Sequence, residues 1–241
     1  MKVVRIITVV GIVCCALAIS ASASVIIVFE EDFETYTNGE NIIGQNGWYG
    51  WEDPATPVIA SPVGLSPNMS ARFDPSGPLW QNLSNDVVVD SSMGPQAVLT
   101  YKSYYPANTS GLLWTAFGDW KVQLSQKTGI HGLPPGTFYL GDDSGTGVPG
   151  SGLFIPDTWG EIGIVIDWAS DTAVWTYNGI VFSTRTDFVE ESYATLDFLT
   201  TPASWGDGLT GPAYIDDITI KIVPEPSTLA LFGLAGLALA H

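Results

Sequence analysis

The stretch from Trp159 to Thr184, WGEIGIVIDWASDTAVWTYNGIVFST, restricts the fold more than any other part of this chain. Isoleucines recur at every second position from Ile162 to Ile166, which is the period of a half-buried β-strand. Asn178-Gly179 is the strongest short hairpin signal, because both residues accept a positive φ. The stretch therefore predicts three antiparallel strands, joined by a turn at 169–171 and a hairpin at 178–179.

The apolar residues elsewhere also follow the strand period. Strand-like runs lie at 25–29, 97–105, 114–125 and 213–223. Between 24 and 221, no apolar stripe recurs at the i, i+3, i+4, i+7 spacing of an amphipathic helix. Segments rich in glycine and proline, at 52–68 and 141–152, are interpreted as loops. The sequence therefore predicts an all-β fold, as a sandwich or jelly roll.

The last strand-like run, AYIDDITIKIV, contains two adjacent aspartates, Asp216 and Asp217. Successive side chains of a strand point to opposite faces of the sheet. Strict alternation therefore predicts that Asp216 shares one face with Tyr214 and Ile218. Asp217 is then expected on the opposite face.

The first 23 residues have the pattern of a secretory signal peptide. Lys2 and Arg5 give a positive start, an apolar run follows at 6–19, and Ala21-Ser22-Ala23 is a small-x-small cleavage pattern. The apolar run is shorter than the roughly 20 residues of a membrane span. We therefore expect a signal helix, cleavage after Ala23, and one exported domain at 24–222.

Both cysteines, Cys14 and Cys15, lie inside this signal, so the exported chain is expected to have no disulfide and no cysteine ligand. Without the signal, six basic residues face 25 acidic ones, a net charge near −19. This charge disfavours nucleic acid and anionic membranes as partners and favours divalent cations and neutral polymers. The two histidines, His131 in a loop and His241, give no basis for a zinc centre.

The sequence does not pair catalytic carboxylates at a useful spacing. Glu161 and Asp167 share one face of a predicted strand, but at the usual rise per residue they lie roughly 20 Å apart. A retaining glycosidase needs its two carboxyl groups about 5 Å apart. No Ser-His-Asp arrangement can be argued either, so we expect no enzymatic activity.

Three segments carry a family resemblance: EEDFETYTNGENIIGQNGW at 30–48, DWASDTAVWTYNG at 167–179 and GPAYIDDITI at 211–220. They resemble the concanavalin A-like lectin/glucanase superfamily, in particular its LamG-like and carbohydrate-binding-module jelly rolls, over most of 29–222. The resemblance implies that Asp-Phe-Glu and Ile-Asp-Asp-Ile lie on neighbouring strands of a jelly-roll sandwich. The glucanases of this superfamily carry Glu-x-Asp-x-x-Glu, which this chain lacks, so a degenerate glycoside hydrolase is a distant alternative.

The resemblance also implies a structural calcium ion. Glu34 and Asp217 occupy the positions that share Ca²⁺ in related modules, and Asp32 and Asp216 are neighbours that can replace them. Ca²⁺ takes six to eight oxygen ligands, and alternation places Asp32 and Glu34 on one pleat face. We therefore expect Ca²⁺ between the first and last strands. Solvated carboxylates without a metal are the alternative.

Aromatic residues in loops are candidates for a sugar-binding surface, because exposed rings stack on sugar faces. The candidates are Trp48, Tyr49 and Trp51 in NGWYGW, and Trp80 and Trp205 in segments rich in glycine and proline. The tryptophans in strand-like runs are interpreted as core residues, namely Trp114, Trp120, Trp159, Trp168 and Trp175. Packing within the loops is the alternative for the five candidates.

The chain ends in VPEPSTLALFGLAGLALAH, at 223–241. Its apolar run has no polar face and, at about 20 Å of helix, is shorter than a hydrocarbon core of about 30 Å. The motif Val223-Pro224-Glu225-Pro226-Ser227 and this run resemble the PEP-CTERM sorting segment of Gram-negative bacteria, also called the ice-binding protein C-terminal domain. The resemblance implies recognition by an exosortase, a membrane protease, and transient membrane association through a C-terminal helix. The family's terminal arginine cluster is missing, so the segment is interpreted as truncated.

These patterns predict an exported, non-enzymatic protein of the cell surface or extracellular matrix, associated with exopolysaccharide or biofilm and a candidate for carbohydrate binding. The alternative is a structural or adhesive surface protein without a specific glycan ligand. Ice binding gains no support, because the chain has no regular Thr-x-Thr array.

Overall fold

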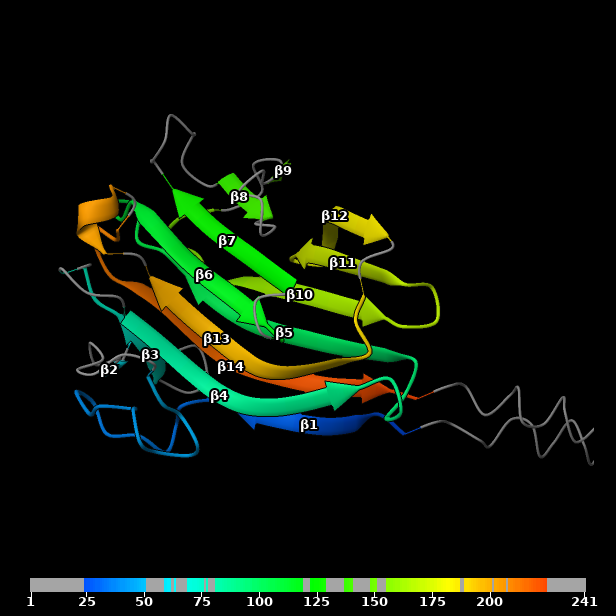
Figure 1. The fold of residues 1–241 in the computed structure, drawn as a ribbon. Helices are drawn as coiled ribbons and strands as arrows, with labels where there is room; N and C mark the ends of the chain where they lie inside the picture. The colour runs from blue at the N-terminus through cyan, green and yellow to red at the C-terminus, as the bar shows by residue number, and fades with distance from the viewer. Residues whose placement is uncertain are drawn as a thin grey trace, which may run out of the picture.

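The computed structural model describes residues 24–50, 59–61, 63, 69–75, 77, 81–118, 122–128, 137–140, 148–150, 155–186, 189–200, 202–206 and 208–224. In this part of the chain, two antiparallel sheets stack face to face (Figure 1). The predicted all-β sandwich is therefore confirmed. The predicted signal helix and C-terminal helix lie outside the described residues.

The described residues form fourteen β-strands and one short 3₁₀ helix, η1 (Ala203–Trp205). The strands are β1 (Ile26–Glu31), β2 (Ile59–Ser61), β3 (Ser70–Phe73), β4 (Gln81–Asp90), β5 (Gln96–Tyr104), β6 (Gly111–Phe117), β7 (Val122–Thr128), β8 (Thr137–Leu140), β9 (Val148–Gly150), β10 (Gly160–Asp167), β11 (Thr172–Tyr177), β12 (Ile180–Thr186), β13 (Ser192–Thr200) and β14 (Ala213–Val223). No helix within these ranges has the length and hydropathy to cross a membrane.

Sheet A has the strand order β12-β11-β10-β5-β14-β3-β2, and β1 pairs with β14 on the edge that β3 also uses. Sheet B has the order β4-β13-β6-β7-β8-β9. The pairing of β1 with β14 joins the first and last strands of the domain, as the resemblance implies, but Asp-Phe-Glu at 32–34 follows the end of β1 and does not lie on the strand. Two short strands, β2 and β9, lie in segments that the sequence indicates as loops, and this is a correction.

The three antiparallel strands predicted within 159–184 are confirmed as β10, β11 and β12. Asn178 and Gly179 have φ angles of 48° and 76°, as a hairpin turn with two left-handed residues requires. The isoleucines from Ile162 to Ile166 are at most 1% exposed and pair with the aromatic strand β11. Local hydrophobic pattern and turn chemistry therefore agree here.

The last strand, β14, departs from strict alternation at its two aspartates. Its pairing with β5 shifts between Asp216 and Thr219, and Asp217 has a φ of 48°. Such a β-bulge adds one residue and moves the following side chains to the other face. Ile218 therefore points into the core, whereas Tyr214 packs against Tyr104 at a ring distance of 5.7 Å on the outer face. The predicted shared face of Tyr214 and Ile218 is wrong because of this bulge.

Aromatic residues join the two sheets in the core. Tyr101 of β5 meets Phe198 of β13 edge to face, with ring centroids 5.1 Å apart. The Tyr101 hydroxyl also lies 2.6 Å from Thr115 Oγ1 of β6. Trp175 is 1% exposed and belongs to this core, as the sequence predicts. These contacts pack sheets A and B against one another through a shared core.

Candidate functional site

Strand β1 ends at Glu31, whose carboxylate points into the sandwich and is 8% exposed. Its Oε1 accepts a hydrogen bond from the Phe33 backbone N–H at 2.9 Å. Its Oε2 accepts hydrogen bonds from Tyr36 Oη at 3.2 Å and from Trp48 Nε1 at 3.0 Å. One buried carboxylate therefore satisfies three donors from the segment that follows β1.

The sequence reasoning above missed Glu31, although a signal for it exists. Phe29 packs against the core, and Glu31 stands two residues later on the same strand face. Strand period alone therefore indicates an inward carboxylate. Burial, together with the charge and hydrogen bond of Glu31, raises the pKa of Tyr36 above its usual range, so Tyr36 stays a hydrogen-bond donor.

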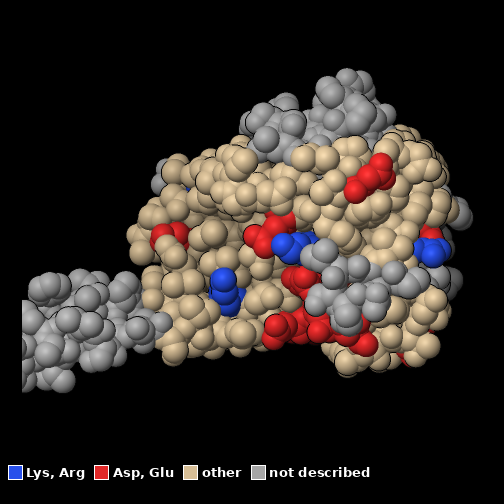
Figure 2. All heavy atoms as spheres, turned by 180° about the vertical axis from the view of Figure 1, so that it is seen from behind, with Lys and Arg blue, Asp and Glu red and all other residues tan. Residues whose placement is uncertain are grey.

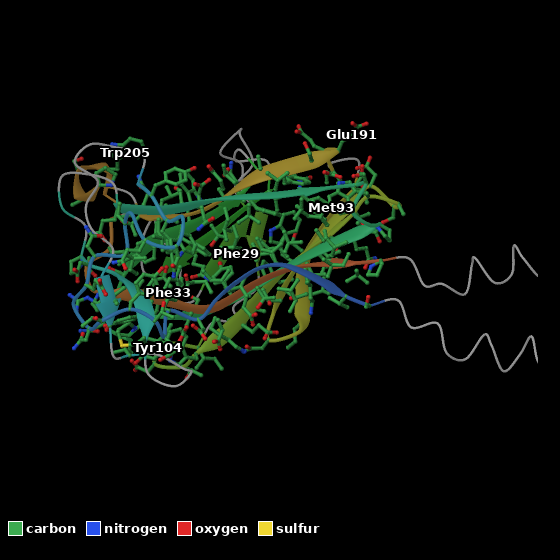
Figure 3. All side chains as sticks on the ribbon, turned by 90° about the horizontal axis from the view of Figure 1, so that it is seen from below. Phe29, Phe33, Met93, Tyr104, Glu191 and Trp205 are labelled. Carbon is green, nitrogen blue, oxygen red and sulfur yellow. The ribbon has the colours of Figure 1, made fainter. Side chains whose placement is uncertain are left out.

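Trp48 lies in the core rather than on a ligand surface. It is 1% exposed and stacks on Phe33 with ring centroids 6.1 Å apart. It also meets Phe29 edge to face at 5.6 Å, and Figure 3 shows Phe29 between the two sheets. Trp48 was predicted to contact a ligand, and this is corrected: its ring faces already contact Phe29 and Phe33.

Tyr49, the next residue, points the other way. Its backbone exchanges two hydrogen bonds of 2.9 Å with Ser84, which extends sheet B beyond the edge of β4. Its hydroxyl donates to Asp86 Oδ1 at 2.8 Å. Burial of Trp48 therefore places Tyr49 at the rim of the face of sheet B that points away from the core.

We call this surface the outer face of sheet B. Its residues alternate with core residues such as Leu83, Thr115 and Phe198 along the same strands. Strand pairing aligns them across the sheet, so that Ser84, Asp197 and Ala116 form one row. The described members include Asn82, Ser84, Asp86, Val88, Leu112, Trp114, Ala116, Gln123, Thr195, Asp197 and Leu199.

Most of this outer face is shielded from water, and its buried members are both apolar (Leu112, Ala116 and Leu199) and polar. Asn82 and Ser84 are both 0% exposed, and Asp197 is 3% exposed. Asp197 Oδ2 accepts a hydrogen bond from the Thr195 hydroxyl at 3.3 Å. Within the described residues, Ser84 Oγ is buried without a hydrogen-bond partner. A buried hydroxyl without a partner costs about 1–3 kcal/mol, so a ligand that hydrogen-bonds there gains affinity.

Trp114 also belongs to this outer face and is partly exposed. It pairs with Leu199 across the strands and alternates with the core residues Leu113 and Thr115. Its interpretation as a core residue is therefore corrected. The strand pattern around it, GLLWTAF, is apolar on both faces, so periodicity gave no direction for the indole.

The remaining aromatic candidates are dispersed. Trp205 lies in η1 and is 61% exposed. Figure 3 shows it at the end of the sandwich opposite Met93. Trp51 and Trp80 lie outside the described residues. Of the three candidates within the described residues, Tyr49 lies at the outer face of sheet B, whereas Trp48 and Trp205 do not.

The acidic segments meet where β14 changes partner from β3 to β1. Asp32 Oδ1 accepts the Glu34 backbone N–H at 3.1 Å, and Asp216 Oδ1 accepts the Asp217 backbone N–H at 2.8 Å. Asp32 and Glu34 do not share a pleat face as predicted, because β1 ends at Glu31 and Phe33 adopts a φ of 56°.

Asp217 lies in the electrostatic field of this acidic group. Burial raises its pKa, the Lys102 ammonium lowers it, and the charges of Asp32 and Glu34 raise it further. Figure 2 shows acidic side chains gathered on this side of the molecule. Lys102 itself pairs with Glu161 at 3.0 Å. The four predicted carboxylates therefore lie in one region of the fold.

The calcium prediction can be compared with this geometry. Carboxylate oxygens are the donors that Ca²⁺ prefers, and backbone carbonyls and water complete its shell. Within the described ranges, however, no group of three or more His, Cys, Asp or Glu side chains is arranged to hold a metal ion. The four carboxylates are therefore of the ligand type that calcium prefers, but their side chains are not arranged around one point as in a complete metal site.

Glu161 and Asp167, the carboxylates considered for catalysis, lie at the two ends of β10. Glu161 accepts the Lys102 ammonium, and Asp167 accepts a hydrogen bond from Gln96 Nε2 at 2.7 Å. Each carboxylate is thus held by a different partner on the outer face of sheet A. The arrangement offers no acid/base pair.

The fold defines a concanavalin A-like jelly-roll sandwich, and the comparisons with known proteins agree. A sialidase matches with a TM-score of 0.57 and 13% identity, over 83% of this chain and 19% of its own. An endo-1,3-beta-glucanase from Streptomyces sioyaensis matches with a TM-score of 0.53 and 15% identity, over 85% and 100%. Crh5 transglycosylase matches with a TM-score of 0.51 and 16% identity, over 85% and 86%. The chain spans about a fifth of the sialidase, and at these identities the likeness concerns the fold alone.

The end of the chain is more specific. Residues 223–240 match the PEP-CTERM protein-sorting motif. No curated protein sequence matches the chain. The chain therefore joins a two-sheet sandwich of concanavalin A-like fold to a PEP-CTERM sorting motif, which indicates an exported, exosortase-sorted protein of the cell surface.

The Glu31 hub predicts a stability effect. We expect Glu31→Gln to lower the free energy of unfolding by about 1–3 kcal/mol, because the amide nitrogen then faces one of the three buried donors. The neighbouring, exposed Glu30 is the control, and Glu30→Gln is expected to stay within about 0.5 kcal/mol. Urea unfolding followed by tryptophan fluorescence measures both. Equal stability of the two variants would contradict the hub.

The acidic cluster predicts a pH effect in the absence of divalent cations. Because the folded-state pKa of Asp217 is raised, this group destabilises the fold above that pKa and is neutral below its unfolded value of about 3.9. Asp217→Asn is therefore expected to raise the melting temperature at pH 7 and to leave it unchanged near pH 3. Asp90→Asn should lower it at pH 7, because hydrogen bonds from Ser92 hold the pKa of Asp90 down. Melting curves between pH 3 and pH 7, recorded with chelator, measure both changes in melting temperature. If both variants shift the melting temperature at pH 7 in the same direction, the pKa directions assigned to Asp217 and Asp90 are wrong.

Proposed function

We propose that this protein is a non-enzymatic, carbohydrate-binding component of the cell surface or extracellular matrix, and that the outer face of sheet B binds the glycan. The observation that carries this proposal is the partly exposed Trp114 beside a row of buried polar groups. Binding sites for small polar ligands combine aromatic walls with a few fixed hydrogen-bonding groups. A polysaccharide of the matrix is the expected partner.

The chemistry of this face suits a sugar in two ways. A pyranose ring has an apolar face that stacks on an indole, and Trp114 presents its indole on this surface. Its hydroxyls need both donors and acceptors, which Ser84, Asp197 and the Tyr49–Asp86 pair supply. Ser84 Oγ has no hydrogen-bond partner in the part of the chain that the structure describes, so a ligand hydroxyl placed there would supply one.

The same face argues against hydrolysis. Glucanases of this superfamily use two glutamates on one strand, whereas β4, β6 and β13 contain no glutamate. The carboxylates on the described outer face are Asp86 and Asp197, and Asp197 is already hydrogen-bonded by Thr195. Retaining hydrolysis needs a nucleophile and an acid/base about 5 Å apart. We therefore propose binding without turnover, although enzymes share the fold.

A structural or adhesive role without a specific glycan is the second candidate. The observation that favours it is the shielding of Asn82, Ser84 and Asp197 from water. Because these residues are shielded, less of the outer face of sheet B is accessible to a ligand. In either case, the sorting segment provides transient membrane association before the exosortase releases the chain.

Trp114→Leu tests the glycan proposal. The change keeps an apolar side chain but removes the stacking face, so affinity for a retained polysaccharide should fall roughly tenfold. Trp159→Leu is the matched control, because Trp159 is also partly exposed but packs on Tyr104 at the outer face of sheet A. Affinity electrophoresis against matrix polysaccharides measures both. Equal retention of both variants contradicts the site, and no retention of the unmodified protein favours the structural alternative.

We also propose that Glu34 and Asp217 hold a structural Ca²⁺, with Asp32 and Asp216 as neighbouring oxygens. The support is their shared region, the raised pKa of Asp217 and the mutual repulsion that a cation relieves. Such an ion would join the segment after β1 to the bulge of β14. It would stabilise the fold and take no part in chemistry.

Calcium is therefore expected to raise the melting temperature, since a ligand of the folded state alone adds about 2.7 kcal/mol at a hundredfold excess over Kd. In Asp217→Asn the response should vanish, while Asp90→Asn, away from the cluster, should keep it. Calorimetry with calcium and with chelator measures the response. An unchanged midpoint in the unmodified protein contradicts the calcium proposal.

A further inference from the structure

The sorting motif begins inside the folded domain. Val223 is the first residue of the segment that matches the motif, and it is also the last residue of β14, paired with Gln96 of β5. Pro224 follows at once. The motif therefore has no spacer: its first residue is fixed by the hydrogen bonds of sheet A.

The same end of the sandwich presents apolar side chains. The pairing of β1 with β14 places Ile26 opposite Ile222 and Ile27 opposite Lys221. Ile26 is 50% exposed and Ile27 is 58% exposed. In Figure 1, β1 and β14 lie side by side and the chain leaves the sandwich from both at one end. Figure 3 places Met93, which is 41% exposed, at this end as well.

The turn between β4 and β5 closes this end around the start of the motif. A Cβ at Gly94 would lie 2.6 Å from Ile222 Cγ2 and 3.2 Å from the Val223 carbonyl oxygen. The turn therefore packs directly on the end of β14. We call the exposed residues Val25, Ile26, Ile27 and Met93 the exit patch.

The length of chain beyond the domain limits how far an enzyme can stay from this patch. Five residues, Pro224 to Thr228, separate β14 from the apolar run that starts at Leu229. Fully extended, they span at most about 18 Å. A protease that lies in the membrane and binds this motif is therefore held within about 18 Å of the end of the sandwich.

We propose that the exit patch is a docking surface for the exosortase, which binds it together with the Pro-Glu-Pro motif. The proposal rests on the sorting motif and is independent of glycan binding. A protein partner is favoured over lipid because the chain carries a net charge of −17, which anionic lipid headgroups repel. Exposed apolar residues beside a recognition motif are typical of protein interfaces.

The test uses the full chain, produced together with an exosortase-type protease, and follows loss of the C-terminal segment by mass. The variant Ile26→Ser with Ile27→Ser is expected to be processed roughly tenfold more slowly. The control is Ile180→Ser with Val181→Ser on β12, because these side chains are 55% and 56% exposed and lie outside the patch. The control should be processed at the unmodified rate.

A spacer variant makes the test sharper. About six Gly/Ser residues inserted between Val223 and Pro224 keep the motif intact but move it away from the patch by up to about 20 Å. Processing should slow by a similar factor, and the spacer combined with Ile26→Ser and Ile27→Ser should slow it no further. If the two changes do not slow processing additively, both act by disrupting the same contact between the patch and the exosortase.

Four outcomes are distinguishable. Slow patch and spacer variants with a normal control support docking. Patch variants processed at the unmodified rate overturn it, while processing of the unmodified chain still supports the sorting function. If the patch variant (Ile26→Ser with Ile27→Ser) is processed normally but no longer binds phosphatidylethanolamine/phosphatidylglycerol vesicles, the patch contacts lipid and the proposal is overturned. An unmodified chain that is never cut removes the sorting function and the docking proposal together.

Discussion

The buried carboxylate of Glu31 is the interaction on which the functional surfaces depend. It accepts hydrogen bonds from Phe33, Tyr36 and Trp48 and so fixes the chain reversal after β1. Trp48 is drawn into the core, and Tyr49 is consequently turned outward onto sheet B. A salt bridge on the surface would not fix the chain reversal in this way, because exposed ion pairs contribute little to stability. A single inward acid thus links the core to the proposed glycan face.

A second constraint is the β-bulge of β14 at Asp216 and Asp217. One edge of β14 pairs with β3 before the bulge and with β1 after it, so the strand connects two parts of sheet A. The bulge turns Asp217 toward the field of Asp32 and Glu34. Beyond it, regular pairing continues to Val223 and leads directly into the sorting motif. The acidic cluster and the exit from the domain are thus set by one strand.

Local patterns predicted the parts of the fold that local physics decides. The hairpin at Asn178 follows from turn chemistry and period-two isoleucines, and it is confirmed. The bulge at Asp217 could not be read from alternation, because a positive φ there depends on the neighbouring strands. The direction of Trp114 was lost because its strand is apolar on both faces. For Glu31, in contrast, the strand period does indicate an inward side chain, and only the acidic character of the residue argued against its burial.

The proposed function requires that the outer face of sheet B binds a polysaccharide without cleaving it. Hydrogen exchange of the exported protein, with and without a matrix polysaccharide of known chain length, tests this claim most directly. Binding at this face predicts slower exchange in peptides from β4, β6 and β13, no change in β10 and β11, and an unaltered polysaccharide chain length afterwards. Protection confined to sheet A, or shortening of the polysaccharide, would contradict it.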